Sequence, residues 1–230
     1  RRVIDVLSAP YEVGYGRGIE LGATVGIALA PEHGADADLL LTRADMALYA
    51  AKAAGKGRVL VFAQEMEKKA QERARLEIEL RAALDGNDEI FVFYQPIIDI
   101  ETGNVTAREA LLRWHHAQRG WISPTQFVPV AEQSGLIDRL GAFVLSAACS
   151  EAAGWQDGAR VAVNISGKQL GKGTLAPAIL AALVKSGLSP DRLEIEVTET
   201  SLHASEMACI DDLRRLRDMG VRVALDDFGT

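Results

Sequence analysis

The sequence predicts an α/β protein built in two parts, and two observations carry this prediction. Short apolar runs alternate with amphipathic stretches along most of the chain, which is the pattern of strands joined by helices in a parallel sheet. A charged segment separates a short first region from a longer second region. In the second region this pattern fits either an open doubly wound sheet or a (β/α)8 barrel.

The composition is that of a globular protein, because 48% of the 230 residues are hydrophobic and 25% are charged. No apolar run reaches the roughly 20 residues that a membrane-spanning helix needs, and no signal peptide opens the chain. We therefore expect a cytoplasmic segment without membrane contact, and leave open whether the parent protein is anchored upstream. The net charge of −7 argues against DNA binding, because phosphate backbones are bound by clustered Lys and Arg. Cys149 and Cys209 have no metal-binding spacing and are expected to pack in the core.

The first sixty residues predict a small α/β unit. Residues 19–29 run apolar or alternate, which indicates a strand. Residues 36–54 show helical spacing that Gly55 ends, and residues 58–62 form a short apolar run typical of a buried strand. Together they predict part of a domain that occupies residues 1–63.

The charged segment of residues 64–84 predicts one helix of about twenty residues. It is rich in Glu, Lys, Arg and Ala, and it keeps Leu76, Leu80 and Leu84 on one face. We interpret it as a helical linker between residues 1–63 and residues 85–230. A solvated helix that covers a neighbouring domain would show the same pattern.

The second region repeats strands and helices in order. The strand-like segments read IFVFYQPI, AREALLRW, RVAVNIS, RLEIEVTET and VRVALDDFG. The predicted helices cover residues 124–134, 136–155, 175–186 and 206–219. Because parallel strands open their carboxyl ends on one face of a barrel, polar residues at these ends should lie near one another.

Polar side chains with oxygen atoms stand in or at the end of four of these strands. They are Glu109, Asn164, Glu196, Glu199, Asp226 and Asp227. Carboxylates that converge repel one another unless cations lie among them, and an all-oxygen set suits Mg²⁺ or Mn²⁺. Two adjacent aspartates can reach two ions roughly 3.5–4 Å apart, as in two-metal phosphate chemistry. For any one residue alone, an ordinary polar strand end is a sufficient explanation, whereas the set of six favours a metal site.

From about residue 84 to residue 230 the chain resembles the EAL family of cyclic di-GMP phosphodiesterases. The motifs that carry the resemblance are YQPI, EALLRW, SPTQFVPVAEQSGLI, VNIS, LEIEVTET and LDDFGT. Residues 1–62 resemble the C-terminal part of a GGDEF domain through ATVGIALAPEHGADADLLLTRADMALYAAKAAGKGRV. The resemblance implies a GGDEF–EAL signalling protein of a bacterial second messenger. It also implies a fold: a partial GGDEF α/β domain followed by an incomplete EAL-type (β/α)8 barrel, or TIM barrel.

The resemblance also implies roles for single residues. The residues implied to bind a first metal ion are Glu109, Asn164, Glu196 and Asp226. Asp227 would reach a second ion and take part in catalysis together with Glu199, which would hold the loop after DDFG. Arg113 would hold a phosphate of cyclic di-GMP, and Gln95 would line the substrate groove. The implied reaction is hydrolysis of one phosphodiester by a metal-activated water, giving linear pGpG.

The sequence departs from the family pattern in ways that leave alternatives open. The family's catalytic lysine and a later glutamate and glutamine lie on strands beyond the DDFG strand, so we expect a fragment with about five of eight barrel strands and no turnover of its own. Upstream, Lys52 matches a phosphate-contacting lysine of GGDEF domains, but Gly55, Lys56 and Gly57 stand where Gly-Arg-Asn is common. Weak nucleotide binding or regulation is therefore as plausible there as synthesis.

Three functions are compatible with the second region: an active phosphodiesterase, a degenerate EAL module that binds cyclic di-GMP without cleaving it, and a scaffold for partners. The intact metal ligands favour the first. Homodimerisation through the EAL barrel stays open. We expect Trp114, Trp121 and Trp155 to pack internally, with Trp114 closest to a guanine.

Overall fold

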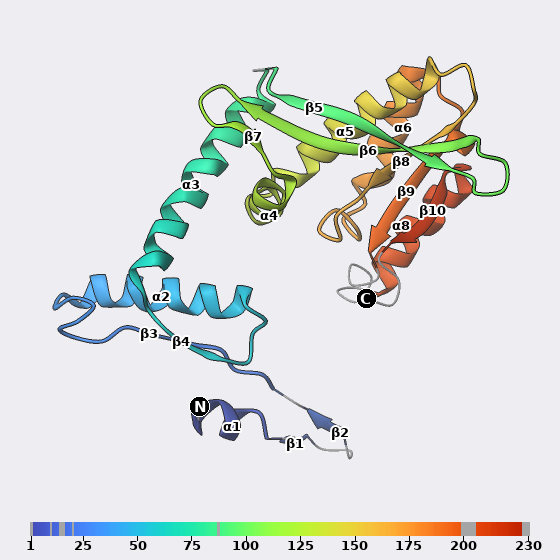
Figure 1. The fold of residues 1–230 in the computed structure, drawn as a ribbon. Coiled ribbons are helices and arrows are strands. Elements are labelled where there is room, and N and C mark those ends of the chain that lie inside the picture. The colour runs from blue at the N-terminus through green and yellow to red at the C-terminus, as the bar shows by residue number, and fades with distance from the viewer. Residues whose placement is uncertain are drawn as a thin grey trace. The chain divides into compact units, whose positions relative to one another are not determined.

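The computed structural model describes residues 2–9, 11–13, 17–19, 21–86, 88–198 and 206–226. The chain divides into two compact units, residues 1–75 and residues 76–230. Figure 1 shows the order of the elements along the chain. Each helix of the described residues is too short or too polar to cross a lipid bilayer.

The first unit consists of short strands and one long helix. Its elements are α1 (Arg2–Leu7), β1 (Tyr11–Val13), β2 (Arg17–Ile19), β3 (Val25–Ile27), α2 (Ala37–Ala53) and β4 (Val59–Val61). β1 and β2 pair antiparallel, and β3 and β4 pair parallel. Within the predicted strand of residues 19–29, β3 contains only Val25–Ile27, and these three residues pair with the three residues of β4.

The helix α2 packs closely on β3. Asp36 caps its N-terminus, where the carboxylate accepts a hydrogen bond from the Leu39 amide at 3.0 Å. Gly26 lies in the middle of β3, and a Cβ atom there would collide with the carbonyl oxygen of Ala44 and the amide nitrogen of Leu48. The glycine therefore permits the close approach of strand and helix.

The helix α3 (Gln64–Leu84) spans the predicted helical segment, but both of its halves take part in tertiary structure. In the first half, Glu67 pairs with Arg43 at 3.3 Å, and the Arg73 guanidinium lies 4.4 Å from the ring centre of Tyr49. In the second half, Leu80 is fully buried in a cluster of the second unit that also contains Trp114 and Phe127, among others. The division between the units falls inside the helix, whereas we predicted boundaries at its ends.

The second unit is built on one sheet with helices packed against it. Its strands are β5 (Ile90–Ile98), β6 (Val105–His116), β7 (Gly120–Ile122), β8 (Arg160–Asn164), β9 (Leu193–Thr198) and β10 (Arg222–Asp226). Its further helices are α4 (Pro124–Ser134), α5 (Ile137–Ala153), α6 (Leu175–Ser186), the 3₁₀ turn η1 (Pro190–Arg192) and α8 (Glu206–Asp218). Figure 1 shows β8, β9 and β10 side by side.

The sheet order is β10-β9-β8-β6-β5, with β7 added to β6. The strands from β6 through β8 and β9 to β10 run parallel, as the alternation of strands and helices predicted. β5 runs antiparallel to β6, because residues 99–104 connect the two strands by a short turn that reverses the chain. Among the described strands, β5 and β10 are the ends of the sheet, which is therefore open.

The core of this unit lies between the parallel strands and their helices. Val161, Val163 and Ile195 are fully buried there, among side chains of α5, α6 and α8. Cys149 and Cys209 pack in the same cluster, as predicted, and are not joined in a disulfide. Burial raises the pKa of the Cys149 thiol to about 11, so this side chain is an inert packing residue at neutral pH.

Candidate active site at the strand ends

Neighbouring parallel strands bring four of the predicted site residues to one part of the sheet. β6 carries Glu109, β8 ends at Asn164, β9 carries Glu196 and β10 ends at Asp226. Asn164 lies in register with Glu196, and its Nδ2 atom donates a hydrogen bond to Glu109 Oε1 at 2.8 Å. Glu109 lies inside the twelve-residue strand β6, and not at its end as we had predicted. The register between the strands therefore accounts for the proximity of these residues, and a shared position at strand ends does not.

Glu196 has the most perturbed acidity in this group. It is half-buried, and this burial raises the pKa of its carboxyl group to about 7. The negative charges of Glu109 and Asp226 raise this pKa further, as does that of Glu194. The site thus holds like charges close enough to oppose one another, which a bound cation would relieve.

The donor set fits a hard divalent cation, since it consists of carboxylate and amide oxygens. In the part of the chain that the structure describes, no three side chains of His, Cys, Asp or Glu form a ready-made metal cluster. Asn164 Nδ2 donates to Glu109 Oε1, so two of the predicted ligands lie within hydrogen-bond distance of each other. Glu199 and Asp227 lie outside the described residues, and their roles stay predictions.

Gln95 and Arg113 lie on the same face of the β5–β6 pair as Glu109. Gln95 is directly opposite Glu109, and Arg113 is four residues further along β6, so the period of two places all three on one face. Arg113 Nη1 donates to the Leu112 carbonyl oxygen at 2.8 Å, and its guanidinium lies 5.8 Å from the ring centre of Phe93. The two predicted substrate-binding residues are thus beside the acidic group.

The loop after β8 is held by polar contacts that the sequence did not indicate. Ser166 donates from Oγ to Glu132 Oε1 at 2.6 Å, and its amide donates to Gln169 Oε1 at 3.2 Å. Gln169 is buried and occupies the space that Gly141 leaves on α5. These contacts tie the loop that follows Asn164 to α4 and α5.

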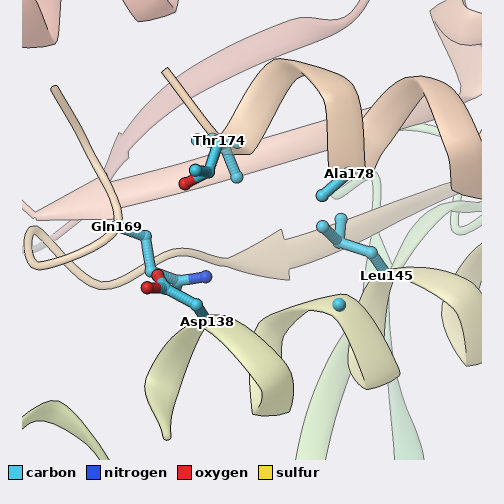
Figure 2. A pocket seen from close by; sticks show the side chains of 7 residues that line it. Asp138, Leu145, Gln169, Thr174 and Ala178 are labelled. Carbon is cyan, nitrogen blue, oxygen red and sulfur yellow. The ribbon is translucent and has the colours of Figure 1, made fainter. Parts of the chain in front are cut away.

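A small cavity of about 130 Å³ lies next to this loop. Figure 2 shows Gln169 and Asp138 at one end of it and Leu145 and Ala178 at the other. Its lining residues come from α5, α6 and the loop before α6, and none of them is a predicted site residue. The cavity is therefore separate from the acidic group.

Three aromatic residues near the site were not recognised from the sequence. Phe91, Phe93 and Trp121 are exposed, although we expected Trp121 to pack internally. The alternation in IFVFYQPI could have revealed the two phenylalanines, because it places both on the same face of the strand as Gln95. Trp114 packs as predicted: it is fully buried, contacts Phe127 and donates from Nε1 to Glu89 at 3.0 Å. It lies on the opposite face of β6 from Glu109, and its predicted position near a guanine stays a prediction.

Sequence comparisons identify the family of this chain. Residues 77–230 match the EAL domain family, and residues 1–58 match the GGDEF domain of diguanylate cyclases. The chain therefore belongs to the EAL domain family, with a GGDEF domain preceding the EAL domain.

Among named relatives, the chain is 38% identical over 234 residues to the cyclic di-GMP phosphodiesterase PdeR of Escherichia coli. It is 36% identical over 233 residues to the bifunctional diguanylate cyclase/cyclic di-GMP phosphodiesterase MucR of Pseudomonas aeruginosa. Both matches cover 100% of this chain but only 35% and 34% of the relatives, so the chain spans about a third of their length.

Solved structures show the same architecture. The MucR phosphodiesterase in complex with cyclic di-GMP superposes with a TM-score of 0.64 at 39% identity, over 68% of this chain and 64% of that chain. The EAL enzyme Bd1971 in its cAMP-bound form gives a TM-score of 0.65 at 26% identity, over 85% of this chain and 51% of that chain. These likenesses confirm the predicted class, an incomplete EAL-type barrel that follows part of a GGDEF domain.

Proposed function

We propose that the protein containing this chain hydrolyses cyclic di-GMP to linear pGpG in a reaction that depends on Mg²⁺ or Mn²⁺. The observation that carries the proposal is the group of Glu109, Asn164, Glu196 and Asp226 on four neighbouring strands, with Arg113 beside it. The phosphodiesterase names of PdeR and MucR support it.

Each residue has a distinct task in this proposal. Glu109, Asn164, Glu196 and Asp226 would hold one divalent ion, and Asp227 would contribute to a second. When bound, such ions lower the pKa of water and neutralise charge that develops on a phosphate. Arg113 positions the phosphate through its guanidinium, while Gln95 lines the groove next to Glu109. Glu199 would fix the loop after β10.

A second candidate function is binding of cyclic di-GMP without cleavage. The observation that favours it is the position of Gln95 and Arg113 on one face of the β5–β6 pair, where both can contact a nucleotide without an ion. A sensor of this kind would keep the contacts of Arg113 and Gln95 to the nucleotide and would not need the ion for turnover.

The proposal is tested with Glu109→Ala and Asp227→Asn in the full-length protein. Loss of Glu109 removes an ion ligand, so turnover should fall and excess Mn²⁺ should restore part of it. Asp227→Asn keeps the side-chain shape but removes its charge, so kcat should fall by orders of magnitude while cyclic di-GMP binding persists. Production of pGpG is followed by chromatography.

Glu101→Gln is the matched control, because it removes an exposed carboxylate from the β5–β6 turn. This variant should keep wild-type turnover. Unchanged kcat in Asp227→Asn would contradict the two-metal part of the proposal. Binding of cyclic di-GMP without any pGpG, at every metal concentration, would establish the sensor function instead.

A further inference from the structure

Phe91, Phe93 and Trp121 form one exposed surface, which we call the aromatic surface. They are 40%, 49% and 58% exposed. Trp121 makes T-shaped contacts with both phenylalanines, at centroid distances of 6.1 Å and 5.6 Å, and a third with His115 at 4.8 Å. These contacts orient the indole while more than half of the residue remains accessible to a ligand.

The aromatic surface continues the row of site residues along β5 and β6. Phe91 pairs with Arg113, whereas Gln95 pairs with Glu109, so all four side chains share one face. Since a strand rises about 3.4 Å per residue, Phe93 lies about 7 Å along β5 from Gln95. The surface is therefore within reach of a nucleotide whose phosphate is at the site.

We propose that Trp121, supported by Phe91 and Phe93, stacks on a guanine base of the dinucleotide while Arg113 contacts the phosphate. This inference rests on the proposed function, since it takes cyclic di-GMP as the ligand. Aromatic side chains stack on any base because every base has a π-face. The assignment makes Trp121 a substrate-binding residue, in addition to Gln95 and Arg113.

The polar residues around the aromatic surface favour a nucleotide over a wholly apolar partner. Arg113 lies over Phe93, and Gln95 and Glu109 continue the same face. A base can occupy the aromatic part while its sugar and phosphate meet the cation and the polar side chains. A lipid or an apolar face of a second copy would leave these polar groups without partners.

The test compares Trp121→Ala and Trp121→Phe with wild type in the full-length protein. For Trp121→Ala we expect KM for cyclic di-GMP to rise roughly 5- to 100-fold with kcat nearly unchanged, because stacking acts on bound substrate and transition state alike. Trp121→Phe should recover most of the affinity. Cyclic di-GMP added in the presence of EDTA should quench tryptophan fluorescence in wild type, and this quenching should be lost in Trp121→Phe.

Phe143→Ala serves as control, since Phe143 is a partly exposed aromatic residue on α5. It should leave KM within twofold of wild type. If the wild-type protein neither binds nor cleaves cyclic di-GMP, the proposed function itself fails. If wild type is active and Trp121→Ala keeps its KM, the stacking inference alone is overturned. A change of oligomeric state in Trp121→Ala with unaltered KM would also overturn it and would assign the surface to a second copy.

Discussion

At the scale of single residues, Glu196 shows how the fold creates a functional environment. By sequence it is one of six candidate residues with side-chain oxygens, and the parallel register places its carboxyl group between Glu109 on one side and Asp226 on the other. Burial and these like charges raise its pKa to about 7. Groups perturbed in this way concentrate at functional sites, which agrees with the proposed role of Glu196 as an ion ligand.

Addition of a divalent ion should therefore stabilise the protein. We expect millimolar Mg²⁺ or Mn²⁺ at pH 8 to raise the melting temperature relative to EDTA, because an ion bound to the folded state shifts the unfolding equilibrium. In Glu196→Gln the ion-dependent increase should shrink. Equal increases in the variant and in wild type would indicate that the ions bind elsewhere.

Tyr94 gives a prediction for alkaline pH. Burial, with smaller contributions from Glu151 and Cys149, raises the pKa of its phenol from 10.0 to about 12. Because the pKa of the phenol is higher in the folded than in the unfolded state, its contribution to the free energy of unfolding is fully present below pH 10. This contribution is lost as the pH rises toward 12.

The variant Tyr94→Phe cannot ionise and keeps a ring against Trp155, which Tyr94 contacts at 5.5 Å. Between pH 9 and pH 11, its free energy of unfolding should therefore fall less than that of wild type. Denaturant titrations at both pH values measure this difference. Parallel losses in the two proteins would contradict it.

At the scale of elements, the helix α3 could be predicted from the sequence, but the burial of its apolar face could not. The charged composition and the leucine spacing predicted a helix, and the helix spans Gln64–Leu84. Whether its apolar face stays solvated depends on a partner surface. That surface includes Trp114 and Phe127, which follow the end of the helix by 30 and 43 residues. The linker interpretation could therefore not be judged from the segment alone.

Leu80→Ala should reduce the free energy of unfolding of the second unit by about 2–4 kcal/mol, because it opens a cavity in a fully buried cluster. Ile78→Ala is the control on the same helix, since Ile78 is 71% exposed, and it should change stability by less than about 0.5 kcal/mol. Urea unfolding followed by tryptophan fluorescence tests the pair. Similar effects of both substitutions would show that the apolar face of α3 does not pack as described.

Gly26→Ala should destabilise the first unit by about 1–3 kcal/mol, because the added methyl group meets backbone atoms of α2 and not a movable side chain. Gly22→Ala is the control, since a Cβ atom at Gly22 meets nothing within 4 Å. Circular dichroism during thermal unfolding compares the two variants. Equal melting temperatures would contradict the close packing of β3 on α2.

For the strands, too, the sequence predicts single segments better than the contacts between them. The order β6, β8, β9 and β10 with intervening helices was predictable, because each segment has a strong period of its own. The antiparallel direction of β5 and the exposure of Trp121 depend on pairing between segments, which local periodicity does not report. The members of the acidic group could be predicted from the sequence. The hydrogen bond from Asn164 to Glu109 depends on the register of the strands, which the sequence does not report.

At the scale of the whole molecule, the two units have separate cores. Among the described residues, both buried clusters of the larger unit contain residues from Leu76 onward only. Effects of Gly26→Ala and Leu80→Ala should therefore add in the double variant, as those of substitutions without shared partners do.

Hydrogen exchange with mass spectrometry resolves the two units. Gly26→Ala should raise exchange in α2 and β4, and Leu80→Ala should raise it around α4 and β6. Faster exchange in both units after either single substitution would show that the cores are coupled.

The position of β5 at the end of the sheet has a consequence for behaviour in concentrated solution. Among the strands described, β5 pairs only with β6, so its other side carries free backbone donors and acceptors. Its nine residues, IFVFYQPII, include no charge, and Pro96 alone interrupts the row of amide donors. Such an edge can serve as a template for strands of other molecules. Closure of a barrel requires a further strand beside β5, and that strand would cover this edge and suppress self-association.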